Sequence, residues 1–202
     1  TGFLVERGGG VKGGPLEGKL GLRAADTGMV FLDGVRVPKD RVLGKEGEGF
    51  RIALSTLDTG RISLAAGAVG LMQRALDLSL AYAGERKQFG KPIAQFQLVQ
   101  EHLAAMKLDL EAARLLTYRA AWKKVKGEPY TLEASLAKLF ASEAANRVAY
   151  RAIQVHGGYG FFEEYEVARL YRDARILTLY EGTSEVQKLI IGAHLTGVRA
   201  FA

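Results

Sequence analysis

The sequence predicts a mostly α-helical protein in which an antiparallel four-helix bundle follows a partial β-domain. From Glu48 onward, apolar residues recur at intervals of three and four, which is typical of amphipathic helices. Residues 1–45 instead hold short alternating apolar runs separated by glycine-rich turns, which is typical of strands. We therefore expect two domains, residues 1–45 and residues 46–202.

The first part contains two strand-like runs, Phe3–Val5 and Met29–Leu32. Between them lie Gly8–Gly10 and Gly13–Gly14, which could suggest a phosphate-binding turn. Pro15 follows, however, and no helix opens there as a dinucleotide-binding fingerprint requires. We expect a flexible loop instead.

The second part has the pattern of three long helices, a shorter one and a terminal one. Hydroxyl groups accept hydrogen bonds from free N–H groups at helix starts, so we expect Thr131 to cap the third helix and Thr183 to cap the last. The expected ranges are 48 to about 84, from after Pro92 to about 126, 131–155, about 164–172, and from Thr183 onward. Long amphipathic helices of this kind form an antiparallel bundle.

Composition excludes several classes of protein. With no cysteine, the chain has no disulfides, thiolate metal sites or cysteine nucleophiles. Its histidines, His102, His156 and His194, lack the spacing of metal ligands, and the nucleophile motif Gly-x-Ser-x-Gly is absent. Charged residues interrupt every long apolar stretch, so we expect no membrane span. The net charge of +6 favours anionic partners, but basic residues are interspersed with acidic ones, which leaves nucleic-acid binding as a weak alternative.

Among the carboxylates, Glu181 has an unusual position. It ends the apolar stretch Ile176–Tyr180 and precedes a helix, so its side chain could project into a pocket. Desolvation by apolar and aromatic neighbours would make this carboxylate a stronger base. The alternative is an acid that complements the helix dipole, which residue chemistry alone slightly favours.

Five blocks of sequence, in order and at similar spacing, resemble the acyl-CoA dehydrogenase family. They are Tyr180–Gln187, Gln154–Gly160, Glu85–Gly90, Val35–Pro38 and Gly47–Phe50. The first resembles the signature that carries the catalytic glutamate of the family. The sequences of this block and of Leu57–Ser63 are most similar to those of short-chain and bacterial members.

The resemblance implies where this chain lies within a longer fold. The family joins an amino-terminal helical domain, a central β-domain and a carboxyl-terminal four-helix bundle. This chain resembles only the latter half of the β-domain and the bundle. It also begins at Thr1 in what reads as the middle of a strand, so we expect an amino-terminal truncation.

The resemblance also implies FAD as the cofactor. The positions of Arg86 and Phe89 resemble those that reach the FAD of a neighbouring subunit. The positions that match flavin contacts are Arg86, Gln88, Phe89, Gln97, Gln154, Val155, His156, Gly157, Gly158, Thr183, Ser184 and Glu185. A guanidinium suits a pyrophosphate, and glycines allow close backbone approach. The structural alternatives are a solvated helix end for Arg86 and a helix stop for Gly157–Gly158.

Positions that resemble acyl-CoA contacts are Asp58, Thr59, Gly60, Arg61 and Gly182. For the first four the alternative is strong, because polar residues on a helix are usually solvated. Some family members take their base from this first helix, where the matching residue is Gly60. Glycine cannot accept a proton, so the resemblance assigns the base to Glu181. No metal is implied.

The expected activity is FAD-dependent α,β-dehydrogenation of an acyl-CoA thioester to a trans-2-enoyl-CoA, as in fatty acid β-oxidation. Glu181 would remove the α-proton while the β-hydride passes to the flavin, and electron-transfer flavoprotein would reoxidise the enzyme. The resemblance favours a homotetramer built as a dimer of dimers. The lack of cysteine and of a visible signal segment leads us to expect a cytoplasmic protein. The alternative function is a non-catalytic structural and oligomerisation module.

Overall fold

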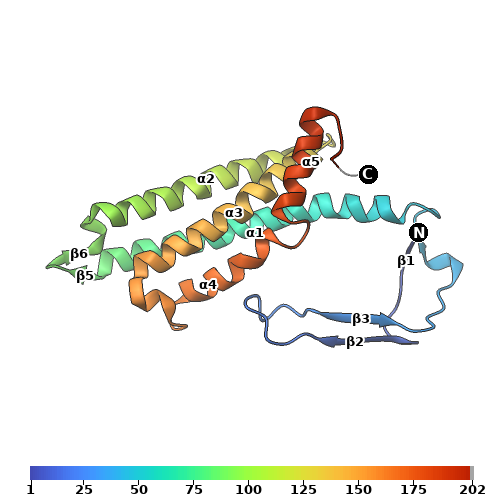
Figure 1. The fold of residues 1–202 in the computed structure, drawn as a ribbon, viewed down its shortest axis with the longest axis horizontal. Helices are drawn as coiled ribbons and strands as arrows, with labels where there is room; N and C mark the ends of the chain where they lie inside the picture. The colour runs from blue at the N-terminus through green and yellow to red at the C-terminus, as the bar shows by residue number, and fades with distance from the viewer. Residues whose placement is uncertain (201–202) are drawn as a thin grey trace. The chain divides into compact units, whose positions relative to one another are not determined.

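The computed structural model describes residues 1–200 and is mostly helical, as the sequence predicts (Figure 1). The chain divides into two compact units, residues 1–57 and the residues from Asp58 onward. This division falls inside the first helix rather than between residues 45 and 46. The two expected domains therefore remain a prediction, and each unit is described here by itself.

The first unit consists of two small antiparallel sheets. Strand β1 (Gly2–Phe3) pairs with β4 (Val42–Leu43), and β2 (Val11–Pro15) pairs with β3 (Gly28–Leu32). Residues Lys39–Arg41 form a 3-10 turn before β4. The apolar run Met29–Leu32 is a strand, as predicted, and its four side chains are between 51% and 71% exposed.

One expectation for this unit is wrong. Gly13 and Gly14 lie within β2 and pair with Val30 and Met29, so they are not part of a flexible loop. A side chain on Gly13 would approach the Met29 carbonyl oxygen to 2.9 Å, which shows how closely the two strands run. The triplet Gly8–Gly10 does form the turn before β2, with positive φ at all three residues.

Three long helices form the main body of the second unit. They are α1 (Gly49–Glu85), α2 (Gln97–Val125) and α3 (Thr131–His156), and α2 runs antiparallel to the other two (Figure 1). The buried faces of α3 are rich in alanine, as at Ala134, Ala141 and Ala145. Small side chains at helix contacts let the backbones approach closely, and α3 packs most extensively against α2.

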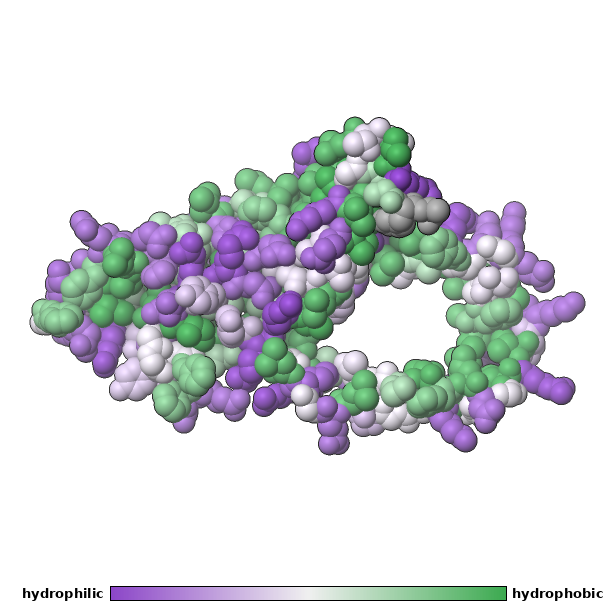
Figure 2. Space-filling model, viewed as in Figure 1, coloured by the Kyte–Doolittle hydropathy of each residue, from purple (hydrophilic) through white to green (hydrophobic). Residues whose placement is uncertain are grey.

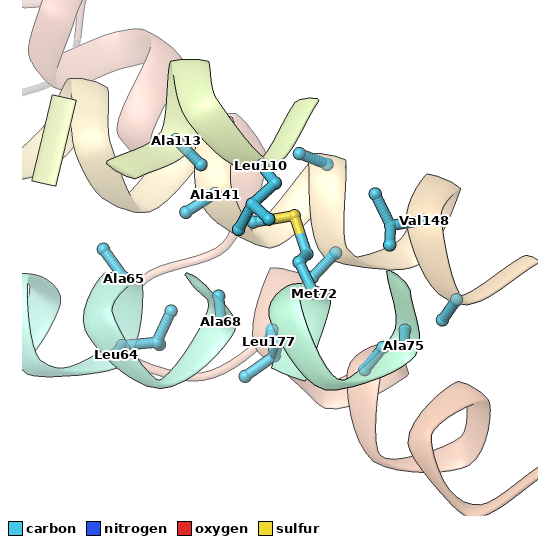
Figure 3. Close-up of a cluster of buried hydrophobic side chains, with 14 of the residues drawn as sticks. Leu64, Ala65, Ala68, Met72, Ala75, Leu110, Ala113, Ala141, Val148 and Leu177 are labelled. Carbon is cyan, nitrogen blue, oxygen red and sulfur yellow. The ribbon is translucent and has the colours of Figure 1, made fainter. Parts of the chain in front are cut away.

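The core lies where these helices meet. Met72 of α1, Leu110 of α2 and Ala141 of α3 are all fully buried and point toward one another (Figure 3). Leu177 joins the cluster from the short 3-10 segment Arg175–Thr178. The apolar periodicity read from the sequence therefore identifies much of the core face of α1.

The connection between α1 and α2 is more structured than the sequence suggests. Strands β5 (Lys87–Gln88) and β6 (Lys91–Pro92) form a hairpin whose two central residues, Phe89 and Gly90, have φ of 51° and 78°. Positive φ at both positions is typical of the tightest hairpin turns. A 3-10 turn, Ile93–Gln95, follows, so α2 begins only at Gln97.

The remaining helices pack on α3. They are α4 (Glu166–Ala174), which begins two residues later than predicted, and α5 (Ser184–Thr196), and the 3-10 turn Gly157–Phe161 precedes α4. Thr183 caps α5 as predicted, because its hydroxyl accepts a hydrogen bond from the Val186 amide at 3.4 Å. The predicted cap at Thr131 is wrong. Tyr130 is the cap residue, and the Thr131 hydroxyl donates to Asp58 Oδ2 at 2.6 Å instead.

Among the residues described, no helix combines the length and hydrophobicity needed to cross a membrane. The helical unit nevertheless exposes apolar side chains, which appear green along α2 in Figure 2. Those of α2 include Leu108, Leu115 and Trp122, spaced seven residues apart and between 56% and 72% exposed. Seven-residue spacing places them along one side of the helix.

Replacing Met72 by alanine should destabilise the protein strongly. The side chain has no exposed area, so its loss leaves a cavity, which costs about 2–5 kcal/mol in the free energy of unfolding. Leu80→Ala in the same helix is the matched control, because Leu80 is 50% exposed and should cost much less. Urea denaturation of both variants measures the difference, and equal losses would contradict the position assigned to the core.

Candidate functional site

The segment that carries Glu181 makes an uncommon backbone turn between the 3-10 segment Arg175–Thr178 and α5. Glu181 has φ of 56° and Gly182 has φ of 93°, both in the left-handed region. A non-glycine residue adopts this conformation only at a cost, so surrounding contacts must hold it.

Three side chains from three helices provide those contacts. Arg61 of α1 donates from Nε to the Glu181 carbonyl oxygen at 3.3 Å. Lys138 of α3 donates to the Gly182 carbonyl oxygen at 2.7 Å. Gln187 of α5 donates from Nε2 to both oxygens, at 3.2 and 3.1 Å. Hydrogen bonds to the two carbonyl oxygens thus connect the turn to α1, α3 and α5.

All three donors are buried. Lys138 and Gln187 have no exposed area, and Arg61 is 5% exposed. Arg61 also pairs with Asp58 at 2.8 Å, and Asp58 accepts the hydrogen bond from Thr131. Asp58 and Arg61 are therefore not the solvated polar residues of the alternative interpretation.

The carboxylate of Glu181 lies against α1. Its Oε2 is buried and has no hydrogen-bond partner within the described residues. A methyl group placed on Gly60 would lie 2.5 Å from this oxygen, so the missing side chain of Gly60 makes room for the carboxylate. A buried oxygen without a partner is costly and marks a site where a ligand can supply the missing interaction.

Helix-dipole complementation suits Glu185 better than Glu181. Glu185 is the acid in the first turn of α5, whereas Glu181 precedes the cap residue Thr183. A hydrogen bond from its own backbone N–H, followed by one from the Thr183 hydroxyl, lowers the pKa of Glu185. Ser184 is buried, and its hydroxyl donates to Glu143 Oε1 at 2.6 Å, which links α5 to α3.

A second group of predicted residues surrounds a surface hollow of about 480 Å³ where α3 ends. It brings together seven of the predicted cofactor contacts: Arg86, Gln88, Gln154, Val155, His156, Gly157 and Gly158. Tyr82, Ile93, Tyr159 and Phe162 complete its lining. Gly157 ends α3 with a positive φ of 61°. Because it is a glycine, it also adds no side chain to the wall of the hollow.

Aromatic rings form one wall of this hollow. The His156 ring stacks on Tyr82 with 4.3 Å between the centroids, and its Nδ1 lies 2.8 Å from the Ala152 carbonyl oxygen. Because a carbonyl can only accept, Nδ1 carries the proton and donates this hydrogen bond, which leaves Nε2 of the neutral ring as an acceptor. Burial lowers the pKa of His156 and favours the neutral ring. Arg86 is exposed, as the alternative of a solvated helix end expects, and its guanidinium also lies 5.3 Å from the centre of the Tyr159 ring.

The structure does not bring all the predicted cofactor residues together. Phe89, 92% exposed at the tip of the β5–β6 hairpin, and Gln97, the exposed first residue of α2, do not line the hollow. Thr183, Ser184 and Glu185 belong to the Glu181 turn. Lys138 and His156 lie 18 positions apart on α3, which corresponds to roughly 27 Å at the rise of an α-helix. The candidate residues therefore form two separate groups.

Sequence reasoning missed Lys138, Gln187, Tyr82 and Tyr159. A signal for Lys138 was available, because it occupies the same helical face as Ala134 and Ala141, at spacings of four and three. A buried charge on such a face needs a partner.

No group of His, Asp and Glu side chains that could hold a metal ion is found among residues 1–200.

Comparison with known proteins identifies a family that this chain resembles in sequence and fold. Residues 47–196 match the family model described as "Acyl-CoA dehydrogenase, C-terminal domain". A relative, the mitochondrial short-chain specific acyl-CoA dehydrogenase of Bos taurus, is 50% identical over 90% of this chain and 44% of its own length. A second, the Caffeyl-CoA reductase-Etf complex subunit CarC of Acetobacterium woodii, is 46% identical over 96% of this chain and 51% of its own.

The solved structure of butyryl-CoA dehydrogenase from Megasphaera elsdenii superposes with a TM-score of 0.93 at 47% identity. That match covers 96% of this chain and 51% of the solved chain. The chain thus spans about half the length of the relatives it matches.

The pH dependence of stability should reveal the buried His156. Because its pKa is lowered on folding, the unfolded chain binds a proton at a pH where the folded chain does not. The free energy of unfolding should therefore fall as the pH drops below about 6.5, the ordinary value for histidine. Urea denaturation at pH 7 and pH 5 should show a smaller fall for His156→Gln than for the unaltered protein. His194→Gln, at an exposed position, is the matched control, and identical falls in all three proteins would contradict the assignment.

Proposed function

Because the chain belongs to the acyl-CoA dehydrogenase family, we propose that it forms part of an FAD-dependent enzyme that converts an acyl-CoA thioester to a trans-2-enoyl-CoA. One observation carries this proposal. The Glu181 carboxylate has a buried oxygen without a partner and faces a glycine that leaves space for it.

The chemistry needs a base at the α-carbon. The α-protons of a thioester are weakly acidic, so a carboxylate must approach them closely in a site with little water. Glu181 supplies such a carboxylate, and its own carbonyl oxygen is held by Arg61 and Gln187. We assign Asp58, Thr59, Gly60, Arg61 and Gly182 to the substrate side of the site. Arg61 acts there through the Glu181 carbonyl, because its guanidinium is already paired with Asp58.

The residues present fit a flavin dinucleotide. At the hollow, Arg86 offers a guanidinium suited to a pyrophosphate, and Gly157–Gly158 offer a wall without side chains. At the other group we propose Thr183, Ser184 and Glu185 as flavin contacts. The Glu185 and Val186 N–H groups at this helix start are already bonded to the Glu185 carboxylate and the Thr183 hydroxyl. When bound, FAD would accept the hydride from the β-carbon.

The separation of the two groups supports a symmetric oligomer. If one flavin contacts the Glu181 group of one subunit and the hollow of another, each subunit contributes to two sites. Phe89 would reach a neighbouring subunit, since it projects from a hairpin and is 92% exposed. The exposed apolar residues of α2 supply further surface for association (Figure 2). We infer a homotetramer built as a dimer of dimers.

Electron-transfer flavoprotein is the proposed electron acceptor. The relative from Acetobacterium woodii is named as a subunit of a reductase–Etf complex, which supports a partner of this class. We propose a cytoplasmic location, which the absence of cysteine and of a visible signal segment favours.

A structural module that is inactive by itself is the second candidate. Strand β3 favours it, because Met29, Val30, Phe31 and Leu32 are all more than half exposed in a sheet of two strands. Such a strand is stable only when other elements cover it. We propose that the rest of a β-domain covers it in the complete enzyme.

Glu181→Gln should abolish turnover. The amide retains the shape of the side chain but cannot accept the α-proton, so kcat should fall by about 10²–10⁴ while FAD and acyl-CoA remain bound. Steady-state assays of the full-length protein with an artificial electron acceptor measure this. Glu164→Gln, at an exposed position, is the matched control. Rapid turnover by Glu181→Gln would rule out its role as the base.

Arg86→Ala should weaken FAD binding. Loss of one charge-assisted hydrogen bond to a phosphate costs roughly 1.5–3 kcal/mol, which corresponds to at least about a tenfold rise in Kd. Fluorescence titration of the apoprotein with FAD gives the Kd. Lys87→Ala changes the same charge at the next residue and should have a much smaller effect, because Lys87 does not line the hollow. Equal affinities for both variants would contradict the placement of FAD there.

A further inference from the structure

Lys138 is a buried cation on a helix face that is otherwise lined by small uncharged residues, alanines and serines. The side chain is fully buried between Ala134 and Ala141 on the alanine-rich face of α3, where the packing of the bundle alone would favour another small residue. Its ammonium donates to the Gly182 carbonyl oxygen at 2.7 Å. Gly182 directly follows the proposed base, so the cation acts on the turn that aims the carboxylate.

The charges around Lys138 come from every element of the site. Arg61 of α1 repels it, and Glu181, Glu143 of α3 and Glu185 of α5 attract it. Burial, followed by Arg61, lowers the pKa of Lys138. Burying an ammonium in this way costs free energy, and the packing of the helices does not require a charged residue at this position.

The unfavourable backbone conformation of the turn must be held by contacts, and Lys138 supplies one of them. Glu181 is held at φ of 56° without being a glycine, and its Oε2 lies where a side chain on Gly60 could not fit. Gln187 donates to the carbonyl oxygens of Glu181 and Gly182 at 3.2 and 3.1 Å. The bond from Lys138 to the Gly182 carbonyl, at 2.7 Å, is the shortest of the described side-chain bonds to these two carbonyls. If the turn relaxed, the carboxylate would move relative to α1.

We propose that Lys138 is a positioning residue for the reaction, which holds the Glu181–Gly182 turn through the Gly182 carbonyl and thereby aims the Glu181 carboxylate. This inference rests on the proposed function for its catalytic consequence. Its structural consequence, a rigid turn, is independent of activity.

Lys138→Met tests the structural consequence first. Methionine has a similar length but neither charge nor donor. Amide hydrogen exchange in residues 180–187 of the full-length protein should become at least about tenfold faster, while residues 141–152 of α3 keep their protection. Lys188→Met removes one positive charge at an exposed position of α5 and is the matched control. Unchanged exchange in the turn, or faster exchange along the whole of α3, would overturn the proposal.

Kinetics of the same variants test the catalytic consequence. Lys138→Met should lower kcat by at least about tenfold and leave KM for acyl-CoA within about twofold, because a displaced base slows the chemical step without weakening binding. A kcat equal to that of Lys188→Met would overturn the proposal. An unaltered protein that does not dehydrogenate acyl-CoA would instead refute the proposed function, and the exchange experiment would still decide the role of Lys138.

If Lys138→Met does not fold, Lys138→Ala provides the same test with a residue that matches Ala134 and Ala141 on the same helix. It removes the donor from Lys138 to the Gly182 carbonyl and leaves the donors of Arg61 and Gln187 in place. The inference expects a localised increase in exchange across residues 180–187 and a lower kcat. No change in either quantity would refute the role of Lys138.

Discussion

The close packing of α3 is the constraint on which the rest of the helical unit depends. Its alanines let α2 approach closely, and the same helix carries Lys138 near its start and His156 at its end. A straight α-helix fixes the separation of these two residues at roughly 27 Å. The two groups of candidate residues are therefore held apart by a rigid element, as the proposed sharing of flavins between subunits requires.

Near the start of α3, Lys138 contacts the turn that carries Glu181, the proposed base. Glu181 adopts a left-handed backbone conformation that is unfavourable for a non-glycine residue, and hydrogen bonds from α1, α3 and α5 hold the turn. Gly60 adds the space into which the carboxylate fits. The hydrogen bonds offset the backbone strain, and together with the space at Gly60 they favour one position of a single carboxylate, which is the arrangement a general base requires.

The helices could be predicted from the sequence because α1 and α3 bury apolar residues at helical spacing. The cap at Thr131 could not, because the Thr131 hydroxyl is taken by Asp58, which lies 73 residues earlier. The strand at Gly13–Gly14 was mistaken for a loop because its stability comes from pairing with β3 rather than from its own residues. The spacing of Lys138 from Ala134 and Ala141 could have shown that it is buried. The partners of Lys138 and Gln187 could not be predicted, because they are backbone carbonyls, which have no sequence signature.

The most direct test of the central claim is a single-turnover experiment without oxygen on the purified protein reconstituted with FAD and freed of unbound flavin. Addition of a short-chain acyl-CoA should bleach the visible absorbance of the flavin, with the enoyl-CoA formed in equal amount. Bound flavin that stays oxidised in the presence of acyl-CoA would contradict the account, because the base and the hydride acceptor would then not act on the same substrate. A protein that retains no flavin would show that this chain serves as a scaffold.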